Sequence, residues 1–232
     1  MSFETMLLSI IIPVYNEELT VGNVIDGVKR ILQQQGLNHE IIVVDDCSYD
    51  NSLEAAKKHS VRIYTLKQHL GKGYALRAGF LRAKGDVIIT IDSDGSHNPE
   101  ELPRVLSPIL EDKADLVIGS RYQNQKSVAA RKLNAFGVKL FNSLIQFLTG
   151  VATSDSQSGY RSMRRMVLEN QNLKSGGYEI ESEMLVKIAK RNFRIDEVPI
   201  SFEQRTYGRS GVDPIVDGFK ILLSIVLAYV KG

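Results

Sequence analysis

The sequence predicts a Rossmann-type α/β protein in which a mostly parallel sheet is flanked by helices, within one domain. Three observations lead to this fold class. Short apolar, β-branched runs alternate with segments whose apolar residues recur at helical spacing, and polar clusters separate the two. The length of 232 residues fits one large domain or two small ones, and 43% hydrophobic with 24% charged residues is typical of a soluble globular protein with a sizeable core.

The first strand and helix are predicted around a polar cluster. The run "LLSIIIPVY" at 7–15 is apolar and β-branched, as expected of a buried strand. Asn16 is predicted to cap the next helix, with Glu17 and Glu18 in its first turn. The apolar residues at helical spacing are Val21, Val24, Ile25, Val28, Ile31 and Leu32.

The same strand–helix unit recurs along the first half of the chain. Further strands are predicted at 40–46, 61–66, 86–92 and 114–120. Helices are predicted from about Asn51, from about Gly73 and from Pro99, where Asn98 is the cap. In such sheets ligands bind beyond the carboxyl ends of the strands. The site is therefore expected at that edge.

Polar residues gather at the predicted carboxyl ends of four strands. They are Tyr15, Asn16 and Glu17 after the first, Asp45 and Asp46 after the second, Asp92, Ser93 and Asp94 after the fourth, and Gly119, Ser120 and Arg121 after the fifth. These residue types also form turns and helix caps. Four clusters at one edge nevertheless favour a binding site.

The spacing of Asp92 and Asp94 indicates a divalent cation. Two carboxylates so close repel each other unless a cation lies beside them, and hard ions such as Mg²⁺ or Mn²⁺ prefer oxygen ligands. Such an ion would recruit a diphosphate, and the chain has no glycine-rich Walker loop for one. Asp45 and Asp46 are suited to accept hydrogen bonds from a ribose or base.

Composition excludes several other classes of function. A formal net charge of +2 is too small to indicate nucleic-acid binding, and the single Cys47 cannot form an internal disulfide. The chain starts without a basic, signal-like segment, and the late run "ILLSIVLAYV" is too short to span a membrane. We therefore expect a cytoplasmic protein.

Seven sequence blocks carry a family resemblance. They are "IIPVYNEE", "VVDDCSYDNS", "GKGYALRAGF", "IDSDGSHNPEEL", "IGSRY", "DSQSGYRSM" and "VPISFEQRTYGRS". In order and spacing the chain resembles inverting family 2 glycosyltransferases of GT-A fold, especially those acting on dolichyl phosphate. The resemblance covers nearly the whole chain. It implies metal-dependent transfer of a hexose from a GDP- or UDP-sugar, such as GDP-mannose, UDP-glucose or UDP-GlcNAc, to a polyprenyl phosphate.

The resemblance also implies roles for the rim residues. Those expected to surround the base and ribose are Pro13, Tyr15, Glu17 and Asp45, and Asp46, Lys72 and Ser93 complete the predicted donor site. Asp92 is expected toward the sugar diphosphate and Asp94 on the metal. Ser96 stands where the family often has a glutamine.

Arginines are the predicted acceptor-binding residues. A phosphomonoester is already anionic near pH 7, so it needs charge neutralisation rather than a general base. The arginines expected to bind it are Arg121, Arg131, Arg161, Arg205 and Arg209, of which Arg121 and Arg205 are expected to be catalytic beside Asp92 and Asp94. The family usually ends this last block R-x-x-G-x-S-K, whereas here a glycine replaces the lysine.

The chain is expected to comprise a nucleotide-sugar half (1–95), an acceptor half (96–212) and a last helix (213–232). That helix is apolar nearly all round, which fits either a membrane interface or the closing of the core. In the first case the protein would be peripheral on the cytoplasmic membrane face.

Two alternatives remain open. An acceptor hydroxyl would need a carboxylate base, for which Glu179, Glu181 and Glu183 are available. The other is a nucleotide-sugar-binding module without turnover.

Overall fold

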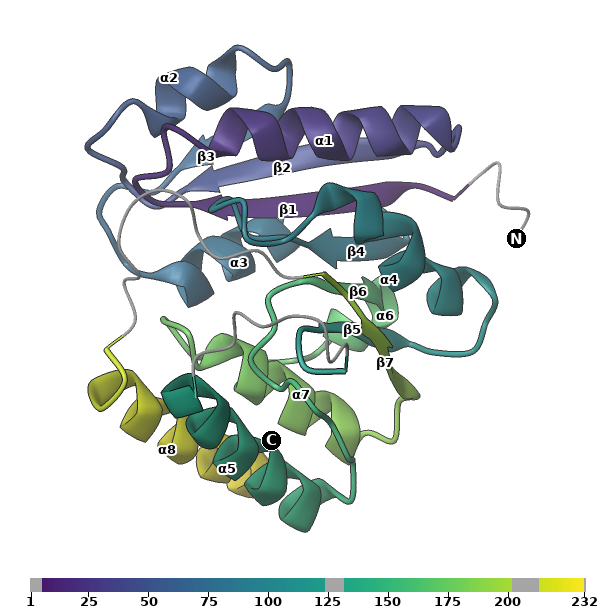
Figure 1. Ribbon diagram of the computed structural model, residues 1–232, viewed down its shortest axis with the longest axis vertical. Helices are drawn as coiled ribbons and strands as arrows, with labels where there is room; N and C mark the ends of the chain where they lie inside the picture. The colour runs from purple at the N-terminus through teal and green to yellow at the C-terminus, as the bar shows by residue number, and fades with distance from the viewer. Residues whose placement is uncertain (1–5, 124–131, 202–212, 232) are drawn as a thin grey trace.

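A seven-stranded mixed sheet forms the centre of the molecule (Figure 1). The computed structural model describes residues 6–123, 132–201 and 213–231. The strands are β1 (Leu8–Val14), β2 (His39–Asp45), β3 (Arg62–Thr65), β4 (Val87–Thr90), β5 (Leu116–Ser120), β6 (Arg161–Arg164) and β7 (Ile195–Pro199). Their order is β3-β2-β1-β4-β6-β5-β7, and β6 runs antiparallel to both neighbours while the other pairs are parallel. The predicted α/β class with a mostly parallel sheet is confirmed.

Helices cover both faces of this sheet. They are α1 (Val21–Gln34), α2 (Ser52–Lys57), α3 (Lys72–Phe80), the 3₁₀ turn η2 (Pro99–Glu101), α4 (Leu102–Leu110), α5 (Lys132–Thr149), α6 (Arg165–Leu168), α7 (Ile180–Lys190) and α8 (Val216–Lys231). Figure 1 shows α1 and α2 on one side of the sheet and α5, α7 and α8 on the other.

Strand alternation divides the core into two layers. Ile10 and Ile12 of β1 pack in the layer that contains α1, α2 and α4. Ile11, between them, packs in the layer that contains α3, α5, α7 and α8. A strand buried on both faces is mostly apolar, and β1 is apolar at every position except Ser9, whose buried hydroxyl donates to Glu40 Oε1 at 2.6 Å.

The first helix begins later than its sequence suggests. The prediction of Asn16 as a helix cap is wrong, because α1 begins at Val21 and Asn16 adopts a left-handed conformation with φ of 54°. Glu17 and Glu18 therefore lie in the loop after β1. All six apolar residues predicted for this helix are buried. The cap at Asn98 is confirmed, since its side chain accepts a hydrogen bond from the Glu100 amide.

The last helix both closes the core and exposes apolar side chains. Ile221, Ile225 and Ala228 of α8 are buried against α5 and α7. Phe219 and Leu223 are 68% and 48% exposed. Among the helices that the structure describes, none has the length and apolar character needed to cross a membrane.

Candidate active site

The carboxyl ends of β1, β2 and β4 meet at one edge, as predicted. The Asp46 amide donates to the Val14 carbonyl at 2.8 Å, which joins the ends of β2 and β1. Ser93 Oγ donates to the Pro13 carbonyl at 2.7 Å, which joins the segment after β4 to β1. The hydroxyl of Ser93 therefore has a structural contact at this edge.

Backbone amides hold the loops after β1 and β2 together. Asn16 donates its amide to Ser48 Oγ at 3.0 Å and accepts from the Tyr49 amide at 3.0 Å. The Glu17 amide donates to Ser52 Oγ at 2.6 Å. The left-handed Asn16 makes this pairing possible, since asparagine tolerates that conformation better than most residues. The two loops thus form one continuous wall.

Aromatic rings line the outer part of this wall. The rings of Tyr15 and His69 stack with centroids 3.8 Å apart and an interplanar angle of 17°. Tyr49 packs edge-on against Tyr15 at 6.2 Å. All three side chains are partly or largely exposed. Flat aromatic faces at a sheet edge are suited to contact a nucleobase.

The two aspartates after β2 have different surroundings. Asp46 accepts from the amides of Leu70 and Gly71 at 2.8 and 2.7 Å, and its Oδ2 lies 2.8 Å from His69 Nδ1. Its carboxylate therefore anchors the loop before α3. Asp45 is also buried, and its Oδ1 accepts from the Ser48 amide at 3.2 Å.

Three charged side chains, Lys72, Asp92 and Glu181, form a triad next to the segment after β4. Lys72, the first residue of α3, places Nζ 2.6 Å from Asp92 Oδ1 and 2.8 Å from Glu181 Oε1. Glu181 is buried, whereas the Asp92 side chain stays 24% exposed. Gly159 faces this pair, and a Cβ there would lie 2.6 Å from Asp92 Oδ2 and 2.7 Å from Lys72 Nζ. Only glycine fits at that position without displacing the triad.

The triad shifts the pKa of each of its members. Burial alone lowers the pKa of Lys72, but the Asp92 and Glu181 carboxylates raise it above its usual value. Burial raises the pKa of Asp92, yet the Lys72 ammonium outweighs this and the pKa is lowered overall. For Glu181 burial prevails over Lys72, so its pKa is raised. Asp92 and Lys72 are therefore ionised near neutral pH.

Asp94 and His97 lie in the turn after Asp92. Asp94 Oδ1 accepts from the Ser96 amide at 3.0 Å and from Ser96 Oγ at 2.7 Å. Ser96 thus orients the second aspartate of the pair. His97 is buried with Nδ1 3.7 Å from Asp92 Oδ2, and burial lowers the pKa of its imidazole.

The Asp92 and Asp94 side chains are suited to a metal ion that binds together with a diphosphate. Across residues 6–123, 132–201 and 213–231, no group of three or more His, Cys, Asp or Glu could hold a metal ion. Mg²⁺ is typically bound by one or two carboxylates together with substrate phosphates and waters. Asp92 and Asp94 are the two carboxylates that would hold such an ion. If Mg²⁺ or Mn²⁺ is held by this pair, its positive charge would offset the negative charge of a diphosphate.

Arg121 follows β5 and is locked by a carboxylate. Its Nε and Nη2 donate to Asp155 Oδ2 and Oδ1 at 2.7 and 2.8 Å. Glu197 in turn accepts from the Asp155 amide at 2.9 Å, which fixes the loop that carries this carboxylate. Burial lowers the pKa of Arg121, but Asp155 raises it overall. The Arg121 side chain is 20% exposed.

Arg161 is not placed to bind an acceptor. The sequence predicted that it binds the acceptor phosphate, but it is completely buried. Its Nε, Nη1 and Nη2 donate to the carbonyls of Ser158, Glu181 and Ser156 at 2.8, 2.8 and 2.7 Å. The guanidinium therefore ties β6 to α7. Arg131, Arg205 and Arg209 lie outside the described residues.

The three glutamates near α7 have different contact partners. Glu183 accepts from the amides of Lys174 and Ser175 and pairs with Lys187, and Glu179 accepts from the amides of Gly176 and Gly177. Both hold the loop before α7. Glu181 instead contacts Lys72 of the triad.

Sequence reasoning missed Asp155, Gly159 and His69. The block "DSQSGYRSM" contains the first two, but no local signal distinguishes an arginine-binding carboxylate from a turn residue.

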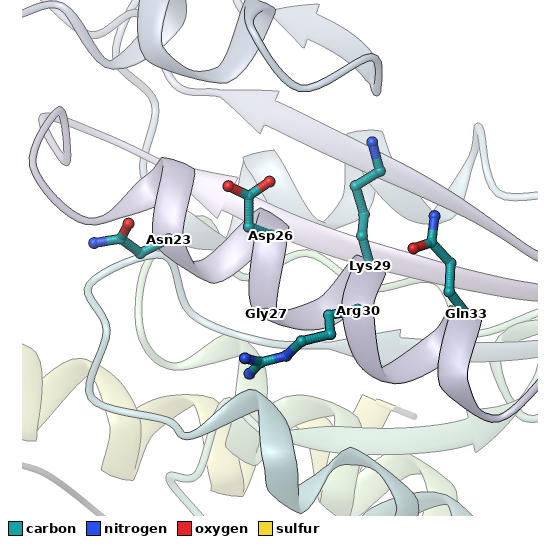
Figure 2. A pocket seen from close by; sticks show the side chains of 6 residues that line it. All are labelled: Asn23, Asp26, Gly27, Lys29, Arg30 and Gln33. Atoms are coloured by element: carbon teal, nitrogen blue, oxygen red, sulfur yellow. The ribbon is translucent and has the colours of Figure 1, made fainter.

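A separate hollow of about 490 Å³ runs along α1 (Figure 2). It is lined by Asn23, Asp26, Gly27, Lys29, Arg30 and Gln33. None of the site residues described above contributes to it.

Comparison with known proteins identifies the class. The family model described as glycosyl transferase family 2 matches residues 9–171, and the chain belongs to this family. The chain is similar to a UDP-N-acetylglucosamine–dolichyl-phosphate N-acetylglucosaminyltransferase of Methanococcus voltae, with 31% identity over 95% of each chain. It is 33% identical to a dolichol-phosphate mannosyltransferase of Pyrococcus furiosus, over 88% of this chain and 59% of that protein.

Solved structures identify the fold. The chain superposes on glucosyl-3-phosphoglycerate synthase of Mycobacterium tuberculosis, solved with Mn²⁺, UDP and phosphoglyceric acid, with a TM-score of 0.77 and 23% identity. The match covers 97% of this chain and 79% of the synthase. The sheet and its helices therefore form a GT-A fold, and the protein is a family 2 glycosyltransferase.

Proposed function

We propose that this protein transfers a hexose from a nucleoside diphosphate sugar to a polyprenyl phosphate, with inversion at the anomeric carbon. The observation that carries the proposal is the charge arrangement at the sheet edge. Asp92 and Asp94 follow β4, and the cationic side chains Lys72 and Arg121 lie on the neighbouring elements. The dolichyl-phosphate enzymes among its relatives support the same acceptor class.

The donor would bind across the ends of β1, β2 and β4. The Tyr15–His69 stack offers a face for the base, and Asp45 is kept as the partner of the nucleoside. A divalent ion, when bound by Asp92 and Asp94, would neutralise the diphosphate and favour its departure. Asp46 is left out of the donor contacts because backbone amides occupy its carboxylate.

The acceptor phosphate would bind at Arg121. A phosphomonoester is a competent nucleophile at pH 7 without a general base, so the protein must mainly offset the repulsion between two anions. Asp155 holds the guanidinium in one orientation, which reduces the reorganisation needed when the phosphate arrives. Arg131, Arg205 and Arg209 remain proposed partners.

A hydroxyl acceptor is the second candidate function. Burial raises the pKa of Glu181, as suits a general base. Its carboxylate, however, forms an ion pair with Lys72 at 2.8 Å. That pairing favours the phosphate acceptor, for which no base is needed.

The apolar surface of α8 supports a membrane-bound acceptor. Ile215, Phe219 and Val230 are 83%, 68% and 70% exposed, and α5 next to it exposes Phe147. An apolar helix surface of this kind can lie in a membrane interface and keep the enzyme near a lipid-linked phosphate.

A donor panel tests the proposal. The full chain is incubated with UDP- and GDP-sugars, Mg²⁺ or Mn²⁺ and a polyprenyl phosphate, and lipid-linked sugar is measured by mass spectrometry. We expect product with one donor and none with Asp94→Asn. Transfer to a saccharide hydroxyl but never to the lipid phosphate, abolished by Glu181→Gln, would instead support the second candidate.

A further inference from the structure

The Lys72 ammonium is paired with Asp92, which is one of the two proposed metal ligands. Its Nζ lies 2.6 Å from Asp92 Oδ1, within direct ion-pair contact. A carboxylate paired in this way is a weaker ligand for a second cation, because the two positive charges compete for it. We propose that Lys72 competes with the divalent ion for Asp92, so that the metal binds tightly only together with a nucleoside diphosphate that draws the lysine away. This inference rests on the proposed nucleotide-sugar donor.

Glu181 makes such an exchange possible. It contacts the same ammonium at 2.8 Å, so Lys72 keeps a counter-charge when it leaves Asp92. A buried lysine without any partner would be strongly unfavourable. Glu181 is itself fixed, because its carbonyl accepts from buried Arg161 at 2.8 Å. In this role Glu181 is a positioning residue for Lys72.

The packing around the triad confines the exchange to a short movement. Gly159 lies against both Asp92 and Lys72, and a Cβ there would come within 2.7 Å of Nζ. The start of α3 is also held, because the Gly73 amide donates to the Gly176 carbonyl at 2.8 Å. The lysine therefore changes partner by moving its side chain, while the backbone of α3 stays in place.

The available metal ligands predict how the divalent ion and the nucleotide affect each other's binding. The proposed metal ligands are the carboxylates of Asp92 and Asp94, and the described residues contain no group of three or more His, Cys, Asp or Glu that could hold a metal ion, so phosphate oxygens must complete the coordination. That alone makes metal and nucleotide bind cooperatively. Competition by Lys72 adds to the cooperativity, and by reciprocity it strengthens nucleotide binding as much as metal binding.

The double variant Lys72→Met with Glu181→Gln separates this competition from a general electrostatic effect. It removes one positive and one negative charge, so the net charge of the triad equals that of the wild type. It also leaves no unpaired lysine or glutamate in the buried region. Lys58→Met is the matched control, because Lys58 is an exposed lysine at the end of α2.

Titration with Mn²⁺ alone, followed calorimetrically or by electron paramagnetic resonance, is the primary measurement. We expect the double variant to bind Mn²⁺ about tenfold more tightly than the wild type without nucleotide. With saturating UDP or GDP its advantage should vanish, so that the coupling between metal and nucleotide becomes smaller. Glu181→Gln alone should weaken binding of Mn²⁺, because Lys72 is then left with Asp92 alone.

Two results would overturn the inference. One is equal or weaker Mn²⁺ binding by the double variant; the other is its failure to fold by circular dichroism, which would make the triad a structural ion pair. If the wild type binds neither nucleotide, with or without Mn²⁺, the proposed function fails and the inference fails with it. If Mn²⁺ binding depends on nucleotide in the same way in the wild type and in the double variant, only the inference is overturned.

Discussion

The two halves of the site are stabilised by different kinds of contact. At the ends of β1 and β2, backbone amides donate to side-chain oxygens such as Asp46 and Ser52. At the ends of β4 and β5, charged side chains pair with one another, as in Lys72–Asp92 and Arg121–Asp155. A buried backbone amide is costly to leave without an acceptor, whereas a cationic side chain in an ion pair can also bind an anionic ligand. The wall formed by the loops after β1 and β2 is thus held by backbone contacts, and the charged side chains of the other half are able to exchange partners.

The largest effect is expected from Asp94→Asn. This change removes a carboxylate from the proposed metal pair while keeping the Ser96 contacts nearly isosteric. Transfer should fall by about 100-fold or more, and EDTA should abolish it in the wild type until Mg²⁺ or Mn²⁺ is restored. Product formation at saturating donor is the measurement, with the exposed Asp196→Asn as control. Full activity in EDTA would contradict the assignment of the ionic half.

Arg121→Ala should separate transfer from donor binding. Without this guanidinium the acceptor phosphate loses a charge-assisted partner, so kcat/KM for the lipid acceptor should fall by about 100-fold. Nucleotide affinity, measured by calorimetry, should change by less than about twofold. Asp155→Asn should show the same pattern more weakly, because it only releases the arginine. A matching loss of nucleotide affinity would place Arg121 in the donor site instead.

Asp46→Asn should act mainly on stability. The substitution replaces a carboxylate oxygen, which accepts backbone hydrogen bonds in a buried place, by an amide donor. We expect the free energy of unfolding to fall by about 2 kcal/mol, with weaker nucleotide binding as the loop before α3 loosens. Urea denaturation checks the first expectation. An unchanged midpoint would show that the amides of this wall are not its main support.

The smallest effect is expected at α8. Deletion of residues 214–232 is a poor test, because it would also remove Ile221, Ile225 and Ala228, which are buried in the core. Phe219→Ser with Leu223→Ser removes mainly exposed apolar area, and liposome affinity should drop by about tenfold. Leu81→Ser, at a leucine that is 85% exposed on another helix end, is the control. Equal flotation of all three proteins would remove α8 from the membrane contact.

Local pattern predicted most of the fold. The first five strands, the apolar face of α1 and the capped turn at Asn98 were visible because neighbouring residues determine them. β6 was not, since "RSMR" has no strand-like apolar pattern and gains its place by antiparallel pairing with β4 and β5. The start of α1 was misplaced because Asn16 bonds to the neighbouring loop rather than to its own helix.

By itself the sequence determined the composition of the site: acidic residues after β2 and β4 and an arginine after β5. Tertiary structure alone decided which charges meet. Lys72 and Glu181 are far apart in the chain, yet they share an ion pair because α3 and α7 pack in the same layer. Arg161 looks like a surface arginine in sequence and is buried because three carbonyls converge on it. Pairing of charges depends on distance in space, which local sequence does not encode.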